Sequence, residues 1–160
     1  EIMPSLVGSE MCIRDSNVTA PNEKKFKDCC NEFWWCLNNV AKGLAREQIP
    51  YVMTMYCSYV KDMLDRMLSW YIGTITDFSV SAGKCGKYFK KYLPDSVYKK
   101  YLKMYCAPET DSIWQSVIST CKLFSDIARL VAGDLGFEYN ASEEEGIRTY
   151  MMNIKSGVYK

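Results

Sequence analysis

Apolar residues recur at steps of three and four along most of the chain, the spacing that places them on one face of an α-helix. A first helix is predicted from Pro21 or Asn22 to about residue 47, and a second follows Pro50. The first helix would bury Phe26, Cys29, Cys30, Phe33, Leu37, Val40, Ala41 and Leu44. The second would bury Val52, Met55, Tyr59, Met63, Met67 and Trp70.

The middle of the chain carries a weaker pattern. Residues 72–83 combine β-branched residues, serines and two glycines, which predicts a loop. Two shorter helical pieces are predicted at 84–93 and 96–105, divided by Pro94 because proline interrupts a helix. This region is therefore expected to be less regular than its flanks.

The clearest helical pattern comes next. It begins at Thr110 or Asp111, either of which can serve as N-cap, and Gly136 is a reasonable stop. Its apolar positions are Trp114, Val117, Cys121, Phe124, Ala128, Val131 and Leu135. A last, weaker helix is predicted over 142–155, with an acidic start like a capping box at Ser142. The pattern as a whole predicts an all-α fold, a bundle of about five to six helices.

Residues 1–16 differ from the rest of the chain. They show no helical or strand periodicity, and MCIRDS at 11–16 looks like a translated sequencing adaptor. We therefore expect an artefactual or disordered leader, with residues 17–160 forming the folded domain.

Composition narrows the class of protein. The 160 residues are 48% apolar and 24% charged with a net charge of +1, which suits one ordinary globular domain. The near-zero net charge excludes a globally basic nucleic-acid binder. The longest uncharged stretch, 48–60, contains Pro50 and is too short to span a membrane. The chain has no histidine, which excludes histidine-based triads and the usual histidine zinc sites.

The eight cysteines form no C-x-x-C pair, so the spacing does not predict a zinc site. Several lie among apolar residues on helical patterns, where a thiol behaves as a small hydrophobic group. We expect reduced and mostly buried thiols in a cytoplasmic protein.

The first helix carries a polar stripe, defined as Glu32, Trp35, Asn39, Lys42 and Arg46. At 100° per residue these side chains fall within about 80° of one another, away from the apolar face. A carboxylate beside an indole suits a cationic sugar, whereas Lys42 and Arg46 suit phosphate. The alternative is a solvated face with one exposed tryptophan.

A second polar feature is a lysine cluster with interleaved tyrosines. The lysines are Lys84, Lys87, Lys90, Lys91, Lys99, Lys100 and Lys103, and the tyrosines are Tyr88, Tyr92, Tyr98 and Tyr101. Such a patch can attract nucleic acid, or it is a solvated face whose tyrosines pack inward. SAGK at 81–84 lacks the spacing and the preceding strand of a phosphate-binding loop, and is not predicted to be one.

Four segments together resemble one enzyme family. They are DCCNEFWW at 28–35, VAKGL at 40–44 followed by Arg46, MLSW at 67–70, and FSVSAGK at 78–84. The chain resembles the aminoglycoside 6-adenylyltransferases, bacterial enzymes that inactivate streptomycin, over roughly residues 20–155. The first block is quite specific, because such runs of cysteine and tryptophan are improbable by chance.

The resemblance implies a two-domain enzyme of which this chain is the helical, substrate-binding half. The other half would be a nucleotidyltransferase domain with a Gly-Ser turn and paired aspartates that bind Mg²⁺. The enzyme would transfer AMP from ATP to the 6-hydroxyl of streptomycin in the cleft between the domains. Those motifs are absent here, so we expect the missing N-terminal domain to supply the catalytic residues and metal ligands, and this chain alone to be inactive.

The resemblance, combined with side-chain chemistry, assigns roles to the stripe. Glu32, Trp34 or Trp35, and Asn39 would bind streptomycin, whose guanidino groups are cationic. Lys42 and Arg46 would approach the ATP triphosphate. No membrane or nucleic-acid partner is expected on this interpretation. Two alternatives remain: a protein-interaction module docking through the stripe, and a nucleic-acid binder using the lysine cluster.

Overall fold

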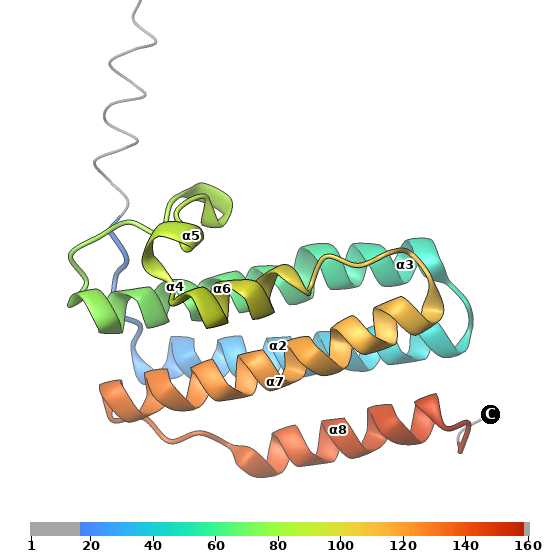
Figure 1. The fold of residues 1–160 in the computed structure, drawn as a ribbon. Coiled ribbons are helices and arrows are strands. Elements are labelled where there is room, and N and C mark those ends of the chain that lie inside the picture. The colour runs from blue at the N-terminus through green and yellow to red at the C-terminus, as the bar shows by residue number, and fades with distance from the viewer. Residues whose placement is uncertain (1–16, 159–160) are drawn as a thin grey trace, which may run out of the picture.

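The computed structural model describes residues 17–158, and the leader predicted for 1–16 lies outside this range. In the described part the protein is a helical bundle whose long helices lie side by side (Figure 1). The layers run from α4 (Lys61–Thr76) through α2 (Glu23–Ala45) and α7 (Thr110–Leu135) to α8 (Ala141–Lys155). The predicted all-α class is confirmed.

Helix α2 forms the centre of the bundle, as its apolar pattern predicts. Asn22 starts the helix by accepting a hydrogen bond from the Lys25 N–H at 2.8 Å. The ring of Phe33 stacks on Phe124 of α7, with centroids 3.7 Å apart. All eight apolar positions predicted for this helix are buried.

The second predicted helix forms as three consecutive segments, α3 (Ile49–Thr54), the π-helix η1 (Met55–Val60) and α4. A π-turn contains about one extra residue, which rotates the following side chains out of the α-helical register. Tyr56 is therefore buried, and its hydroxyl lies 2.7 Å from the hydroxyls of Ser116 and Thr120. The prediction that Tyr59 is a core residue is wrong, since 54% of its surface is exposed, and Met55 is only half-buried.

Helix α4 also extends into the segment predicted as a loop, which begins at residue 77 rather than 72. β-branched residues weaken helix propensity, but Ile72 is fully buried and this packing outweighs the propensity. The helix ends where Asp77 and Phe78 adopt left-handed conformations and the Phe78 ring folds back over Gly73. A Cβ atom at Gly73 would meet that ring at 2.3 Å, so the turn depends on glycine.

The segment around Pro94 forms three short helices, where two pieces at 84–93 and 96–105 were predicted. They are η2 (Lys84–Gly86), α5 (Phe89–Tyr92) and α6 (Asp95–Leu102). The C-terminal end of α7 follows the pattern, with Gly136 in a left-handed conformation. Its N-cap is Glu109 rather than Thr110 or Asp111, and no side chain caps it.

Helix α8 begins one residue before its predicted start. Asn140, and not Ser142, accepts the hydrogen bond from the Glu143 N–H, at 3.3 Å. No helix among residues 17–158 is both long and apolar enough to cross a membrane.

The cysteines of the described chain carry free thiols, and those on α2 and α7 are buried. Burial raises the pKa of Cys29 and of Cys121 to about 12, so these thiols stay protonated at neutral pH. Cys57 and Cys85, by contrast, are exposed.

Candidate functional site

The polar stripe lies on an accessible face of α2. Glu32, Lys42 and Arg46 are exposed and Asn39 is half-buried. Trp35 is 64% exposed, more than any other tryptophan of the chain. The stripe therefore offers its polar groups and one indole to solvent, as its helical spacing predicts.

Trp34, although adjacent to Trp35, does not belong to this surface. Only 1% of its area is exposed, and its ring packs edge-on against Phe33 and Phe124. The Arg148 guanidinium lies 5.6 Å from the ring centroid. Successive helical residues are 100° apart, which puts Trp34 on the core side. The stacking role expected of either tryptophan is thus left to Trp35.

An acidic cavity of about 480 Å³ opens beside the stripe, between α2 and α8. It is lined by Asp28, Asn31, Glu32, Trp35, Glu143 and Ile147. Asp28, Glu32 and Glu143 carry carboxylates, and no lysine or arginine lines the cavity. Glu32 accepts a hydrogen bond from the Cys36 thiol at 3.4 Å, and it also lines a smaller cavity with Asp62 of α4.

The acidic cavity can bind a cation. Carboxylates on two helices can contact separate ammonium or guanidinium groups of one ligand, and an exposed indole can cover an apolar or cationic part of it. Helical spacing predicts that Glu32 and Trp35 share a face, whereas the sequence pattern assigns Glu143 only to a helix start. Because Glu143 is more than a hundred residues from Glu32, no local signal could pair them.

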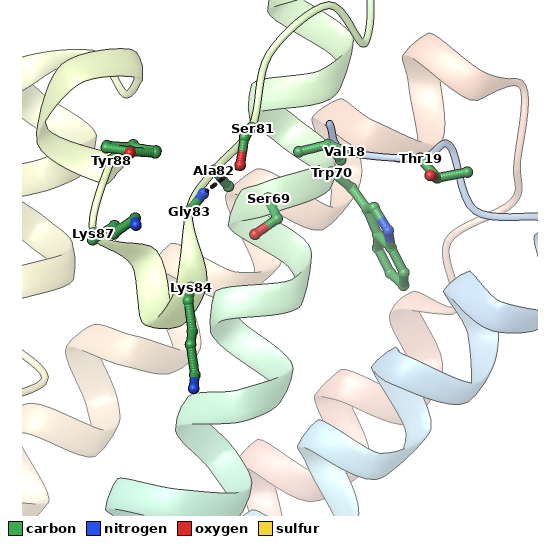
Figure 2. A pocket seen from close by; sticks show the side chains of 10 residues that line it. All are labelled: Val18, Thr19, Ser69, Trp70, Ser81, Ala82, Gly83, Lys84, Lys87 and Tyr88. Atoms are coloured by element: carbon green, nitrogen blue, oxygen red, sulfur yellow. Dashed lines mark hydrogen bonds between the residues drawn. The ribbon is translucent and has the colours of Figure 1, made fainter. Parts of the chain in front are cut away.

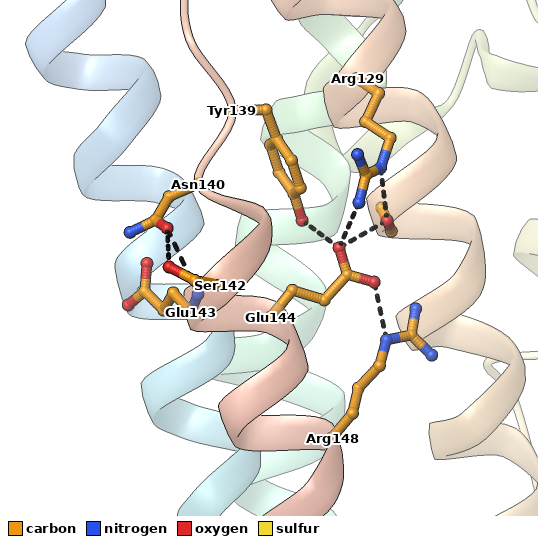
Figure 3. A network of polar contacts seen from close by, with 8 residues as sticks. Arg129, Tyr139, Asn140, Ser142, Glu143, Glu144 and Arg148 are labelled. Carbon is orange, nitrogen blue, oxygen red and sulfur yellow. Dashed lines mark hydrogen bonds and ion pairs between the residues drawn. The ribbon is translucent and has the colours of Figure 1, made fainter.

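A buried polar network holds α8 in place (Figure 3). The Glu144 carboxylate accepts hydrogen bonds from Ser125 at 2.8 Å and Tyr139 at 2.9 Å. It also pairs with Arg148 at 2.7 Å and with Arg129 of α7 at 3.2 Å. Burial by itself would raise the pKa of Glu144, but the hydrogen bonds and the Arg148 charge outweigh burial and lower it. Glu144 is therefore ionised and fixes the helix that carries Glu143.

The structure does not bring Lys42 and Arg46 to the acidic cavity. Ten helical residues separate Lys42 from Glu32, about 15 Å along the axis. Both cations lie at the C-terminal end of α2, where positive charge also stabilises the helix dipole.

A third cavity, of about 430 Å³, follows α4 and has balanced charges. Lys61 pairs with Asp65 at 2.5 Å and Arg66 with Asp62 at 3.1 Å, the two i,i+4 pairs that the sequence suggests. The Tyr101 hydroxyl donates to Asp65 at 2.7 Å. Burial and this hydrogen bond raise the pKa of Tyr101, so its hydroxyl stays neutral. The two lysine and arginine charges of this cavity are therefore each paired with an aspartate, and the cavity has little net charge.

The lysine cluster is exposed along its whole length, but its tyrosines mostly pack inward. Tyr101 is buried, Tyr92 and Tyr98 are half-buried, and only Tyr88 reaches 36% exposure. Single-stranded nucleic acid requires several outward aromatic rings for stacking. This arrangement matches the solvated-face interpretation better than a nucleic-acid surface.

Among residues 17–158, no three cysteine, aspartate or glutamate side chains converge as metal ligands. The three carboxylates that line the acidic cavity do not form such a group. The described residues do not fit a magnesium site.

Comparison with known proteins gives a consistent result. The sequence model of a family described as streptomycin adenylyltransferase matches residues 8–154, a range that begins inside the segment set apart as a leader. The aminoglycoside 6-adenylyltransferase of Campylobacter jejuni is 32% identical over 141 residues, 88% of this chain. That of Staphylococcus aureus is 33% identical over 151 residues, 93% of this chain.

The fold is also similar to a solved structure. The crystal structure of an aminoglycoside 6-adenyltransferase from Bacillus subtilis matches with a TM-score of 0.80 and 31% identity. The match covers 89% of this chain and 54% of that one. The chain spans about half the length of the relatives it matches, 49% of the Campylobacter jejuni protein and 53% of the Staphylococcus aureus protein.

Proposed function

This chain belongs to the streptomycin adenylyltransferase family, and we propose that it is the helical, antibiotic-binding part of an enzyme that transfers AMP from ATP to streptomycin. One observation carries the proposal. The acidic cavity joins three carboxylates to the most exposed tryptophan and contains no cation in its lining. Streptomycin carries guanidino groups, which form charge-assisted hydrogen bonds with carboxylates.

Each residue of the stripe has a distinct proposed role. Glu32 pairs with a guanidinium and Trp35 covers the antibiotic from the side. Asn39 does not line the cavity and would hydrogen-bond the antibiotic one helical turn beyond Trp35. Lys42 and Arg46 approach the ATP triphosphate from the far end of α2. Asp28 is a weaker partner, since Lys24 already contacts it at 2.6 Å.

The chemical step is proposed to depend on a separate nucleotidyltransferase domain that precedes the helical part. The sequence contains no Asp-x-Asp pair, so the present residues would bind and orient the antibiotic. Mg²⁺, held by that other domain, would neutralise the triphosphate charge during transfer. The free thiols among residues 17–158 favour a reducing compartment, and we propose that the enzyme is cytoplasmic.

Binding of streptomycin to this chain tests the proposal directly. Trp35 is exposed and lines the cavity whereas the other tryptophans are buried, so a ligand in the cavity should change the emission of Trp35 most. We expect streptomycin to change this fluorescence saturably. Glu32→Gln should weaken binding roughly ten- to a hundredfold, the equivalent of about 1.5–3 kcal/mol for a charge-assisted contact.

The matched control is Glu145→Gln, which removes an exposed carboxylate on α8 that does not line the acidic cavity. It should leave the dissociation constant within about twofold, because an isolated surface charge contributes little. If both substitutions weaken streptomycin binding equally, the loss reflects the overall charge of the chain and not a contact made by Glu32. If Glu32→Gln binds streptomycin as tightly as the parent chain, the cavity is not the antibiotic site.

A further inference from the structure

A basic cavity of about 460 Å³ lies between α4, the turn at residues 81–84 and the start of the described chain (Figure 2). It is lined by Val18, Thr19, Ser69, Trp70, Ser81, Ala82, Gly83, Lys84, Lys87 and Tyr88. The lining contains two lysines and no carboxylate. This volume lies within the ordinary range for small-ligand pockets.

Lys84 and Lys87 are both exposed to solvent. Within the part of the chain that the structure describes, neither Lys84 nor Lys87 forms an ion pair. In Figure 2 the Lys87 ammonium points toward the Gly83 turn, and Lys84 extends along α4. The Lys87 ammonium also lies 5.0 Å from the centre of the Tyr88 ring, which limits its movement. Both lysines thus line a cavity that has no carboxylate in its lining.

The turn at residues 80–83 is built to hold this shape. The Gly83 N–H donates to the Ser81 hydroxyl at 3.0 Å, and the Tyr88 N–H donates to the Ala82 carbonyl at 3.1 Å. Gly83 has φ +75°, and a Cβ atom there would lie 2.5 Å from Lys87 and 2.7 Å from Tyr88. Only glycine fits both the backbone angle and the close approach of these side chains.

The cavity also contacts the segment through which the chain enters the bundle. The Val18 N–H donates to the Val80 carbonyl at 2.9 Å, which brings Thr19 to the rim of the cavity. The Thr19 hydroxyl adds a donor to the lining, beyond Trp70 from the two lysines (Figure 2). A ligand bound here would touch the entering segment, the turn and α4 at once.

We propose that the basic cavity binds the phosphoryl groups of a di- or triphosphate, with Lys84 and Lys87 neutralising the charge and Thr19 donating a hydrogen bond. The inference deepens the proposed function, because AMP transfer from ATP releases pyrophosphate. The lysines would hold the β- and γ-phosphates in place of Lys42 and Arg46, neither of which lines this cavity. Lysine binds phosphate as a point charge, which suits an open cavity with no fixed fork geometry.

Calorimetric titration of this chain with pyrophosphate, ATP and inorganic phosphate tests the site. We expect pyrophosphate and ATP to compete for one site and both to bind more tightly than phosphate, because they span both lysines. The double substitution Lys84→Met/Lys87→Met should weaken pyrophosphate at least tenfold, since two charge-assisted contacts are lost. Pyrophosphate that binds no more tightly than phosphate, or that does not compete with ATP, would overturn the proposal.

Lys99→Met/Lys100→Met is the matched control, because it removes the same charge from exposed lysines outside the cavity. It should change pyrophosphate affinity less than threefold. An equal loss in both double variants, or a loss in Lys42→Met with none in Lys84→Met/Lys87→Met, would overturn the proposal. Streptomycin binding by the lysine variants shows that they are folded. Because the two ligands are titrated separately, failure here leaves the antibiotic test unaffected.

Discussion

The acidic cavity and the basic cavity are of similar size but opposite charge, and they are built in different ways. The acidic cavity takes its carboxylates from α2 and α8, two long helices that pack directly on each other. The basic cavity takes its lysines from η2 and the turn around it, where the backbone is irregular. The net charge of the chain is only +1, but an acidic and a basic cavity lie at different places on its surface.

Because they are built from different elements, the two cavities should respond to different perturbations. Side chains on packed helices are positioned by the core, so the acidic cavity depends on how α8 is attached. Side chains on a turn are positioned by local backbone geometry, so the basic cavity depends on Gly83. Each cavity can therefore be damaged while the other is preserved.

Reversing the charges should give the largest effect. Glu32→Lys places an ammonium where the antibiotic guanidinium is proposed to bind, and lost attraction plus repulsion should weaken streptomycin about a hundredfold or more. Lys84→Glu should do the same to pyrophosphate. Each substitution should leave the other ligand within about threefold, as measured by parallel titrations. If either reversal weakens both ligands equally, the cavities are not independent sites.

Removing the Glu144 charge should have the next largest effect, and it should act on one cavity. Glu144→Gln leaves Arg129 and Arg148 without their carboxylate, at an expected cost of about 2 kcal/mol. In a domain of this size that lowers the melting temperature by roughly 4–8 °C. Streptomycin affinity should fall because Glu143 moves with α8, whereas pyrophosphate affinity should not. Glu145→Gln, on the exposed side of α8, should leave the melting temperature unchanged.

The pH dependence of unfolding gives a second measure of the same network. The folded pKa of Glu144 is lowered, so its stabilising contribution is complete above its ordinary value of 4.5 and is lost as pH falls through the folded value. The parent chain should therefore lose stability below about pH 4.5, and the Glu144→Gln variant should lack that part of the loss. Identical acid profiles would show that Glu144 does not titrate as its contacts require.

The smallest change in stability is expected from the turn. Gly83→Ala forces a Cβ atom into a backbone region that only glycine adopts readily, and the turn should relax at a cost of about 1 kcal/mol. Pyrophosphate binding should weaken severalfold while streptomycin binding stays constant. Gly146→Ala, where nothing lies near the added methyl group, is the matched control and should affect neither ligand. Unchanged pyrophosphate affinity in Gly83→Ala would separate the turn from the anion site.

Local patterns predicted the parts of the fold that depend on neighbouring residues. The buried face of α2 and the extent of α7 follow from apolar spacing, and Asn22 and Gly136 end their helices as capping rules predict. The stripe also follows from spacing, which correctly places Glu32 and Trp35 together. Trp34 shows where the motif alone misled, because a conspicuous WW pair invites one role for two residues on different faces.

Other features of the fold depend on contacts between distant segments of the chain. The π-turn at η1 shifts Tyr59 outward because Tyr56 reaches hydroxyls on α7, and no periodicity anticipates that bond. The carboxylate of Glu143 joins Glu32 only when α8 packs on α2, and Thr19 joins Lys84 only when the entering segment pairs with Val80. The helices and the family can be predicted from the sequence, because both depend on short runs of neighbouring residues. The two cavities arise from packing, which brings together side chains that lie far apart along the chain.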